Sequence, residues 1–93
     1  MKKTYTVDVD GTLCKEECFT VEDCIKATPV KSVVSLVNKL YDSDFVIIYT
    51  ARRNHLMSAT FEWLDKHGIK YHAVSNRKIP LGNGYVDSVA IKP

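Results

Sequence analysis

Residues 45–49 read FVIIY, an uninterrupted run of aromatic and β-branched side chains. Such a run is typical of a parallel strand covered on both faces, because a strand with one wet face alternates apolar with polar residues. Upstream, Thr4–Val9 alternates tyrosine and valine with threonine and aspartate and stops at Asp10-Gly11, which indicates a strand followed by a turn. The two runs predict neighbouring strands of one sheet.

A helical pattern lies between these two strands. Apolar residues recur there at spacings of three and four, at Val30, Val33, Val34, Val37, Leu40 and Tyr41. We expect Thr28 to cap this helix, Pro29 to occupy its first position, and the helix to end near Asp42-Ser43.

A second helical pattern follows the FVIIY run. Asn54 is expected to cap it, Gly68 to close it, and its apolar face to carry Met57, Phe61 and Leu64. Short strands are expected at Tyr71–Val74 and around Tyr85–Asp87. Strands that alternate with helices predict βαβ units, and therefore an α/β, three-layer Rossmann-like fold. About four parallel strands would carry helices on both faces, in a single domain spanning residues 1–93.

The composition limits which binding partners and which cellular location we expect for the protein. The 93 residues are 45% hydrophobic and carry a formal charge of +2, with basic residues scattered along the chain. This balance indicates neither a nucleic acid nor a membrane as partner, although it does not exclude a nucleic acid. No apolar run approaches the ~20 residues of a membrane span, and the first residues do not resemble a signal peptide. We therefore expect a cytoplasmic protein.

The cysteines, Cys14, Cys18 and Cys24, fall in one short stretch. Their odd number cannot form a closed disulfide framework, so we interpret them as reduced thiols. A zinc site built on them would need a fourth ligand from His55, His67 or His72, and the paired C-x2-C spacing that marks strong zinc sites is absent.

Polar residues gather where the predicted strands end. Asp8 and Asp10 end the first strand, Thr50 ends the second, and Asp87 with Ser88 ends the last. Ligand crevices in open parallel sheets lie outside the carboxyl ends of the strands. Asp8 and Asp10 would share one face roughly 6–7 Å apart. Carboxylates this close repel one another unless a cation lies between them, and hard oxygen ligands suit Mg²⁺.

Each of these residues also has a structural interpretation. An isolated Asp-x-Asp-Gly is ordinarily a turn, and a threonine after a strand is ordinarily a cap. The combination at corresponding strand ends favours a functional site. Arg52 and Arg53 add to it, because cations beside a helix start oppose the helix dipole unless an anion binds there.

The residues at these strand ends resemble the signatures of the haloacid dehalogenase-like (HAD) phosphatases. Residues 7–14, VDVDGTLC, resemble the first signature, D-x-D-G-T, and residues 46–52, VIIYTAR, resemble the second. Lys78 with Pro80 looks like the third, and residues 85–88, YVDS, stand where the acidic fourth is expected. The chain is most similar to a small subgroup without a cap domain, of the bacterial and phage capsule-biosynthesis type.

The resemblance implies a Mg²⁺-dependent phosphatase. Asp8 would attack phosphorus and become a phospho-aspartate, and Asp10 would act as acid and base. Thr50 would hydrogen-bond a phosphoryl oxygen, and Lys78 would neutralise charge near Asp8. Asp8, the backbone carbonyl of Asp10, and Asp87 would hold Mg²⁺. The candidate substrate-binding residues are Thr12, Ala51, Arg52 and Arg53.

Departures from the family pattern leave alternatives open. Ser88 stands where relatives commonly have a second acid, and Lys70 or Arg77 could replace Lys78. The fifteen residues between Thr12 and Thr28 suffice for a flap with Phe19 but not for a lid domain, which favours a macromolecular phosphate, with small phosphates also possible. A homodimer could cover the last strand. The competing interpretation is a catalytically weak or inactive HAD-like phosphate-binding or regulatory module, and transfer to an acceptor other than water is a second.

Overall fold

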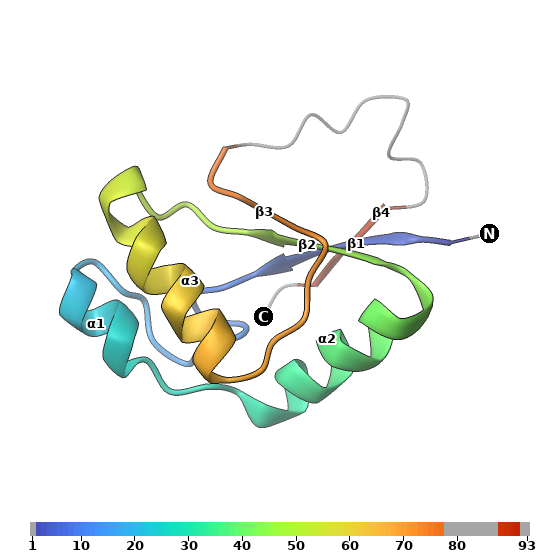
Figure 1. The fold of residues 1–93 in the computed structure, drawn as a ribbon, viewed down its shortest axis with the longest axis horizontal. Coiled ribbons are helices and arrows are strands. Elements are labelled where there is room, and N and C mark those ends of the chain that lie inside the picture. Colours follow the sequence, from blue (N-terminus) through green and yellow to red (C-terminus); the bar gives the residue numbers. More distant parts are fainter. Residues whose placement is uncertain (1, 78–87, 92–93) are drawn as a thin grey trace.

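The computed structural model describes residues 2–77 and 88–91, and the side chains of residues 2–77. Its elements follow one another as strand, two helices, strand, helix and two strands (Figure 1). In chain order they are β1 (Thr4–Asp8), α1 (Val21–Lys26), α2 (Lys31–Ser43), β2 (Phe45–Tyr49), the 3-10 turn η1 (Asn54–Leu56), α3 (Met57–Lys66), β3 (Ala73–Ser75) and β4 (Ser88–Ile91).

The strands form one parallel sheet in the order β3-β2-β1-β4. Val7 of β1 is level with Ile48 of β2 on one side and with Ile91 of β4 on the other. The predicted α/β class with a parallel sheet is therefore confirmed, and the architecture is Rossmann-like. The chain moves from β1 to β2 to β3 in one direction and then returns to the other side of β1, so the strand order reverses at β1. Ligands bind at such reversals in open α/β sheets.

The helices lie on one side of the sheet (Figure 1). The β1-α2-β2 and β2-α3-β3 crossovers run in the same direction across the sheet, and right-handed crossovers in one direction put both helices on the same face. The opposite face of β2 carries Ile47 and Tyr49, which are half-buried, and Phe45, which is 44% exposed. Within residues 2–77 and 88–91, the prediction of helices on both faces is therefore wrong.

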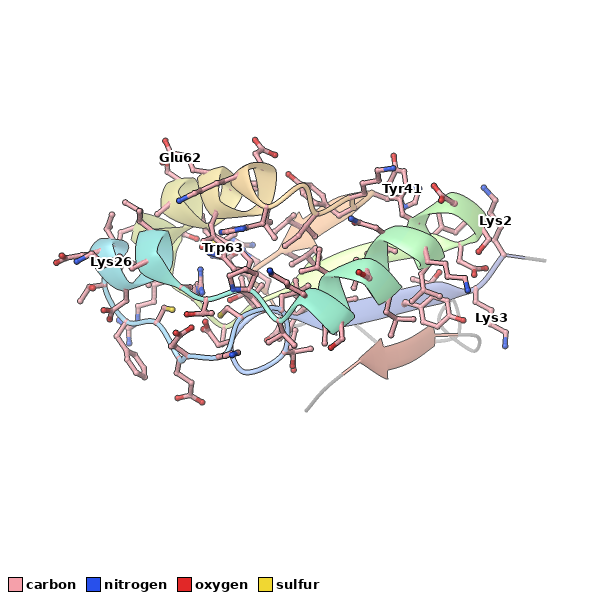
Figure 2. All side chains as sticks on the ribbon, turned by 90° about the horizontal axis from the view of Figure 1, so that it is seen from below. Lys2, Lys3, Lys26, Tyr41, Glu62 and Trp63 are labelled. Carbon is pink, nitrogen blue, oxygen red and sulfur yellow. The ribbon has the colours of Figure 1, made fainter. Side chains whose placement is uncertain are left out.

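The core lies between the helices and the covered face of the sheet. Val7, Val46 and Ile48 are fully buried there. Trp63 of α3, labelled in Figure 2, is 1% exposed, and its Nε1 donates a 2.9 Å hydrogen bond to the carbonyl oxygen of Ala27, just after α1. This bond satisfies the indole and ties α3 to the segment that follows α1.

Local boundaries differ from the predictions at the start of α2. The helix begins at Lys31, one residue after Val30, and no side chain caps it. Thr28 instead donates its hydroxyl to Glu16 over 2.7 Å, and its backbone N–H donates to the same carboxylate over 2.8 Å. The segment before α2 is held by residues 13–16, because Val30 N–H donates to the carbonyl of Leu13. A tertiary contact thus replaces the expected cap.

The buried face of α3 is also rotated from its predicted position. Phe61 is 40% exposed, whereas the buried residues are Ala59, Thr60, Trp63 and Leu64. Gly68 closes the helix with φ of 64°, as predicted, and η1 rather than α3 begins at Asn54. Helix α1 was not predicted from the sequence. Within the described residues, no helix is both long and apolar enough to cross a membrane.

Strand β3 is displaced along the chain from its predicted position, and β4 is described over Ser88–Ile91. β3 covers Ala73–Ser75, and β4 begins at Ser88, whereas a strand was expected around Tyr85–Asp87, which lies outside the described residues. The backbone of Ser88 is level with Thr4, four residues before Asp8. Ser88 therefore lies about 13 Å along the sheet from the end where Asp8 stands, and the expectation that it ends the last strand beside Asp8 is wrong.

Candidate functional site

The first part of the site is the turn that follows β1. Asp8 is the last residue of the strand, and Gly11 has φ of 74°, a left-handed conformation that glycine adopts without a steric penalty. The backbone N–H groups of Thr12 and Cys14 both donate to the carbonyl oxygen of Val9 over 3.1 Å. This tight turn places Asp8 and Asp10 at the carboxyl end of the central strand.

A pocket of about 570 Å³ opens at this end of the sheet. The turn after β1, the segment before α1 and the loop after β2 each supply part of its wall. The residues that line it are Asp8, Val9, Asp10, Glu17, Cys18, Phe19, Tyr49, Thr50, Ala51, Arg52, Arg53, His55 and Leu56. Six of the predicted site residues thus meet around one cavity, namely Asp8, Asp10, Thr50, Ala51, Arg52 and Arg53.

The Asp8 carboxylate in the pocket is not engaged by a neighbouring side chain of the described residues. It is half-buried, and within the described residues its side chain makes no hydrogen bond or ion pair. A carboxylate in that state at the end of a central strand is free to meet a ligand that enters the pocket.

The loop after β2 is held firmly. The backbone N–H of Thr50 donates to the carbonyl of Ser75 over 3.0 Å, and the Thr50 hydroxyl oxygen accepts the N–H of Arg52 over 3.1 Å. Asn76 donates its Nδ2 to the carbonyl of Arg52 and to Asn54 Oδ1. Because the Thr50 oxygen serves as acceptor here, its own O–H remains available as a donor.

Arg52 points inward, toward Asp10. Its side chain is 1% exposed, and its Nη2 lies 2.6 Å from Asp10 Oδ1, while Nε lies 3.2 and 3.3 Å from the two carboxylate oxygens. Nη1 donates to Thr60 Oγ1 over 2.8 Å, and Thr60 donates in turn to the carbonyl of Leu56. In this structure the Arg52 guanidinium therefore contacts Asp10 and Thr60, whereas the sequence placed it among the substrate-binding residues.

Burial is the main cause of the pKa shifts of the thiols around this pair. Burial lowers the pKa of Arg52, but the hydrogen bonds and the charge of Asp10 outweigh burial and raise it overall. Burial, and then the Asp10 carboxylate, raise the pKa of the Cys14 thiol to about 12. Burial also raises the pKa of Cys18 and Cys24. The cysteines are free thiols, as the sequence predicted.

The wall of the pocket opposite β2 comes from residues 15–20. Two hydrogen bonds from Thr28 to the Glu16 carboxylate anchor the beginning of this segment, and they lower the pKa of Glu16. Thr20 caps α1 at its other end by accepting the N–H of Asp23 over 3.1 Å. Phe19 lines the pocket and is nevertheless 74% exposed, so the predicted flap forms a rim.

The remaining predicted residues lie elsewhere. Thr12 is buried behind the turn, does not line the pocket, and has a hydroxyl with no hydrogen-bond partner among residues 2–77. Lys78 and Asp87 lie outside the described residues.

Sequence reasoning missed two partners of the Asp10–Arg52 pair, namely Thr60, which accepts a hydrogen bond from Arg52, and Cys14, which lies beside Asp10. Thr60 could have been suspected as a polar residue on the buried face of α3, four residues after Leu56. Cys14 belonged to the first signature, but no sequence pattern indicated that its sulfur lies 3.6 Å from Asp10 Oδ1.

No protein-family model matches the chain, and no curated protein matches its sequence. Solved structures are similar in fold. A chain of the structure reported as "Structure of the Pnkp1/Rnl/Hen1 RNA repair complex" is 19% identical with a TM-score of 0.72, over 85% of this chain and 27% of that one. A chain of "Structure of Pnkp1/Rnl/Hen1 complex" is 16% identical with a TM-score of 0.68, over 92% of this chain and 32% of that one. At these identities the similarity shows the fold alone, and this chain spans less than a third of the matched chains.

Proposed function

We propose that the protein is a HAD-like phosphatase that hydrolyses a phosphate monoester through a phospho-aspartate on Asp8. One observation carries the proposal. Asp8, without a partner among the described residues, and Asp10, held by Arg52, line the same pocket at the point where the strand order reverses. A nucleophile that is not engaged and an acid/base group that is held in position are what the two steps of this reaction require.

In the first step an Asp8 oxygen attacks phosphorus, and the bond from phosphorus to the leaving oxygen breaks as Asp10 gives that oxygen a proton. In the second step the Asp10 carboxylate takes a proton from a water molecule as that water attacks the phosphorus. The bond between phosphorus and Asp8 then breaks, which releases inorganic phosphate and regenerates both groups. The hydrogen bonds from the Arg52 guanidinium restrict rotation of the Asp10 carboxylate in both steps.

The pocket offers oxygen atoms of the kind that bind Mg²⁺. Mg²⁺ commonly binds through one or two carboxylates, waters and substrate phosphate oxygens. Asp8 supplies a carboxylate without a partner among residues 2–77, and the Asp10 carbonyl oxygen accepts no hydrogen bond there. We therefore propose that Asp8 and the Asp10 carbonyl hold the ion. Asp87 is not retained as a ligand, because its neighbour Ser88 lies about 13 Å along the sheet from Asp8. A bound Mg²⁺ would neutralise negative charge on the phosphoryl group.

The other polar groups bind the phosphoryl group in this proposal. Thr50 retains an O–H to donate, and Ala51 and Arg53 line the pocket beside it, just before η1. Lys78 remains the sequence-derived candidate for charge neutralisation near Asp8. Positioning and charge neutralisation account for most of the catalysis of phosphoryl transfer, so a small protein can suffice.

The open rim favours a phosphate at the end of a large substrate. We propose a nucleic-acid end, because an aromatic side chain with an exposed face offers a base a stacking surface, and Phe19 lines the pocket while 74% exposed. The two similar structures described above are chains of Pnkp1/Rnl/Hen1 complexes, one reported as an RNA repair complex, which agrees with this substrate class. Small phosphate esters are the alternative.

The first test is release of p-nitrophenol from p-nitrophenyl phosphate by the purified chain. We expect turnover with Mg²⁺ and its loss in EDTA, restored by excess Mg²⁺. A comparison of a 3′-phosphorylated oligonucleotide with glucose 6-phosphate then tests the substrate class. Folded protein that binds phosphate without turnover would support the phosphate-binding module instead.

Asp10→Asn tests the proton transfers. Its effect on the first step should depend on the leaving group, because p-nitrophenolate leaves without a proton whereas an alkoxide needs one. We expect the burst of p-nitrophenol to be retained and the release of product from a sugar phosphate to fall by roughly 10²–10⁴-fold. Single-turnover rates on the two substrates measure this difference. Equal losses on both would contradict the assigned role of Asp10.

A further inference from the structure

Two cysteine sulfurs lie beside the Asp10 carboxylate. Sγ of Cys14, Sγ of Cys18 and a carboxylate oxygen of Asp10 are all within 4.8 Å of one another. Donor atoms around a tetrahedral Zn²⁺ are about 3.3–3.8 Å apart, given Zn–S and Zn–O bonds of about 2.3 and 2.0 Å. Cys14 Sγ and Asp10 Oδ1, 3.6 Å apart, already match this spacing, and the other separations need to shorten by no more than about 1.5 Å for the three atoms to share one ion.

We propose that Asp10, Cys14 and Cys18 form a binding site for Zn²⁺. Thiolate sulfur selects a soft or borderline cation such as Zn²⁺ over Mg²⁺, which prefers oxygen. The three-residue gap between the cysteines is also within the spacing common in zinc sites.

Charge balance supports the site. Zn²⁺ binding converts each thiol to a thiolate, so the ligands carry three negative charges. The ion and the buried Arg52 guanidinium, whose Nη2 lies 3.8 Å from Cys14 Sγ, carry three positive charges. The filled site is therefore neutral, and Arg52 can keep one Asp10 oxygen while the other turns to the metal, because a carboxylate has several lone-pair positions.

The ion also has a route of entry and an open coordination position. Asp10 and Cys18 line the pocket, whereas Cys14 lies behind them. Three protein ligands leave the fourth position of a tetrahedral ion to water or to another group from the pocket. His55 also lines the pocket, whereas His72 accepts the N–H of Val46 and His67 packs on Trp63.

The consequence for turnover rests on the proposed function. A carboxylate that ligates Zn²⁺ cannot donate or accept the proton that Asp10 transfers, so Zn²⁺ should inhibit at constant Mg²⁺. Binding itself does not depend on that function, so a zinc-binding chain without phosphatase activity would refute the function and leave the site intact.

The test is titration of the reduced chain with Co²⁺ and then Zn²⁺. We expect one equivalent of Co²⁺ to produce thiolate-to-cobalt charge-transfer absorption in the near ultraviolet, and Zn²⁺ to abolish it. Cys18→Ser should lose this absorption and weaken Zn²⁺ binding by more than roughly tenfold, since the loss of an outer-shell partner alone costs about 10–100-fold.

Cys24→Ser is the matched control, because Cys24 is also a buried thiol but is not one of the three clustered ligands. It should keep the absorption and bind Zn²⁺ as the wild type does. Circular dichroism checks the fold of both variants, and Cys18→Ala replaces Cys18→Ser if the latter unfolds. An absent charge-transfer band in the wild type, its survival in the Cys18 variant, or equal losses in both cysteine variants would overturn the proposal.

Discussion

Asp8→Asn should reduce the turnover of p-nitrophenyl phosphate by roughly 10⁴-fold or more, because the amide cannot attack phosphorus. The fold should survive, since within the described residues the Asp8 side chain makes no hydrogen bond or ion pair, and asparagine has nearly the same shape. The measurements are single-turnover kinetics and urea unfolding. The free energy of unfolding should change by less than about 0.5 kcal/mol.

Asp42→Asn is the matched control for this variant. Asp42 is exposed on α2 and does not line the pocket. It should leave both turnover and stability unchanged. Retained turnover in Asp8→Asn would remove Asp8 as the nucleophile, whereas equal losses in both variants would indicate a general effect of charge.

Arg52→Met should destabilise the protein by about 3 kcal/mol. It removes one member of a nearly buried ion pair and leaves the other, and breaking such pairs costs about 3–5 kcal/mol. We take the lower end because the Asp10 side chain is 24% exposed. The variant also loses the hydrogen bond to Thr60 and should lower kcat more than it raises KM, because Arg52 acts through the position of Asp10.

Arg53→Met is the control for Arg52→Met, because Arg53 is exposed and makes no ion pair among the described residues. Urea unfolding should change by less than about 0.5 kcal/mol for this variant. Arg52→Lys should recover part of the stability but less of kcat, because lysine keeps the charge without the planar fork. Equal stability of the two methionine variants would show that the ion pair contributes little.

The parallel sheet could be predicted because its signal is local. Phe45–Tyr49 is a strand with the predicted bounds, since a run of aromatic and β-branched residues favours a strand on its own. Thr28 could not be placed in the same way. Whether it caps α2 or bonds Glu16 depends on a contact twelve residues away, which propensities do not contain. The covered faces of the sheet likewise depend on the direction of the crossovers, and a run of apolar residues does not reveal that direction.

The candidate site could likewise be predicted only in part, where the signal in the sequence is local. Asp8, Asp10 and Thr50 were placed at one edge because strand ends converge in a parallel sheet. The inward turn of Arg52 could not be foreseen, because it depends on Thr60 of α3 and on the depth of the pocket. The register of β4 was also beyond the sequence, since backbone pairing with Thr4 leaves no local signature at Ser88.

The central place of β1 also determines how the protein opens. β1 is hydrogen-bonded to β2 on one edge and to β4 on the other, so exchange of its amide hydrogens requires that a whole ladder separate. The rim at residues 15–20 belongs to no strand ladder and is held instead by hydrogen bonds of Lys15 and Glu16 to Thr28 and by the buried Cys18 side chain, so it can open without separating the sheet. Amides of the rim should therefore exchange through small, frequent openings, whereas those of β1 exchange only in global unfolding. The pocket can thus widen to admit or release a large ligand while Asp8 keeps its position.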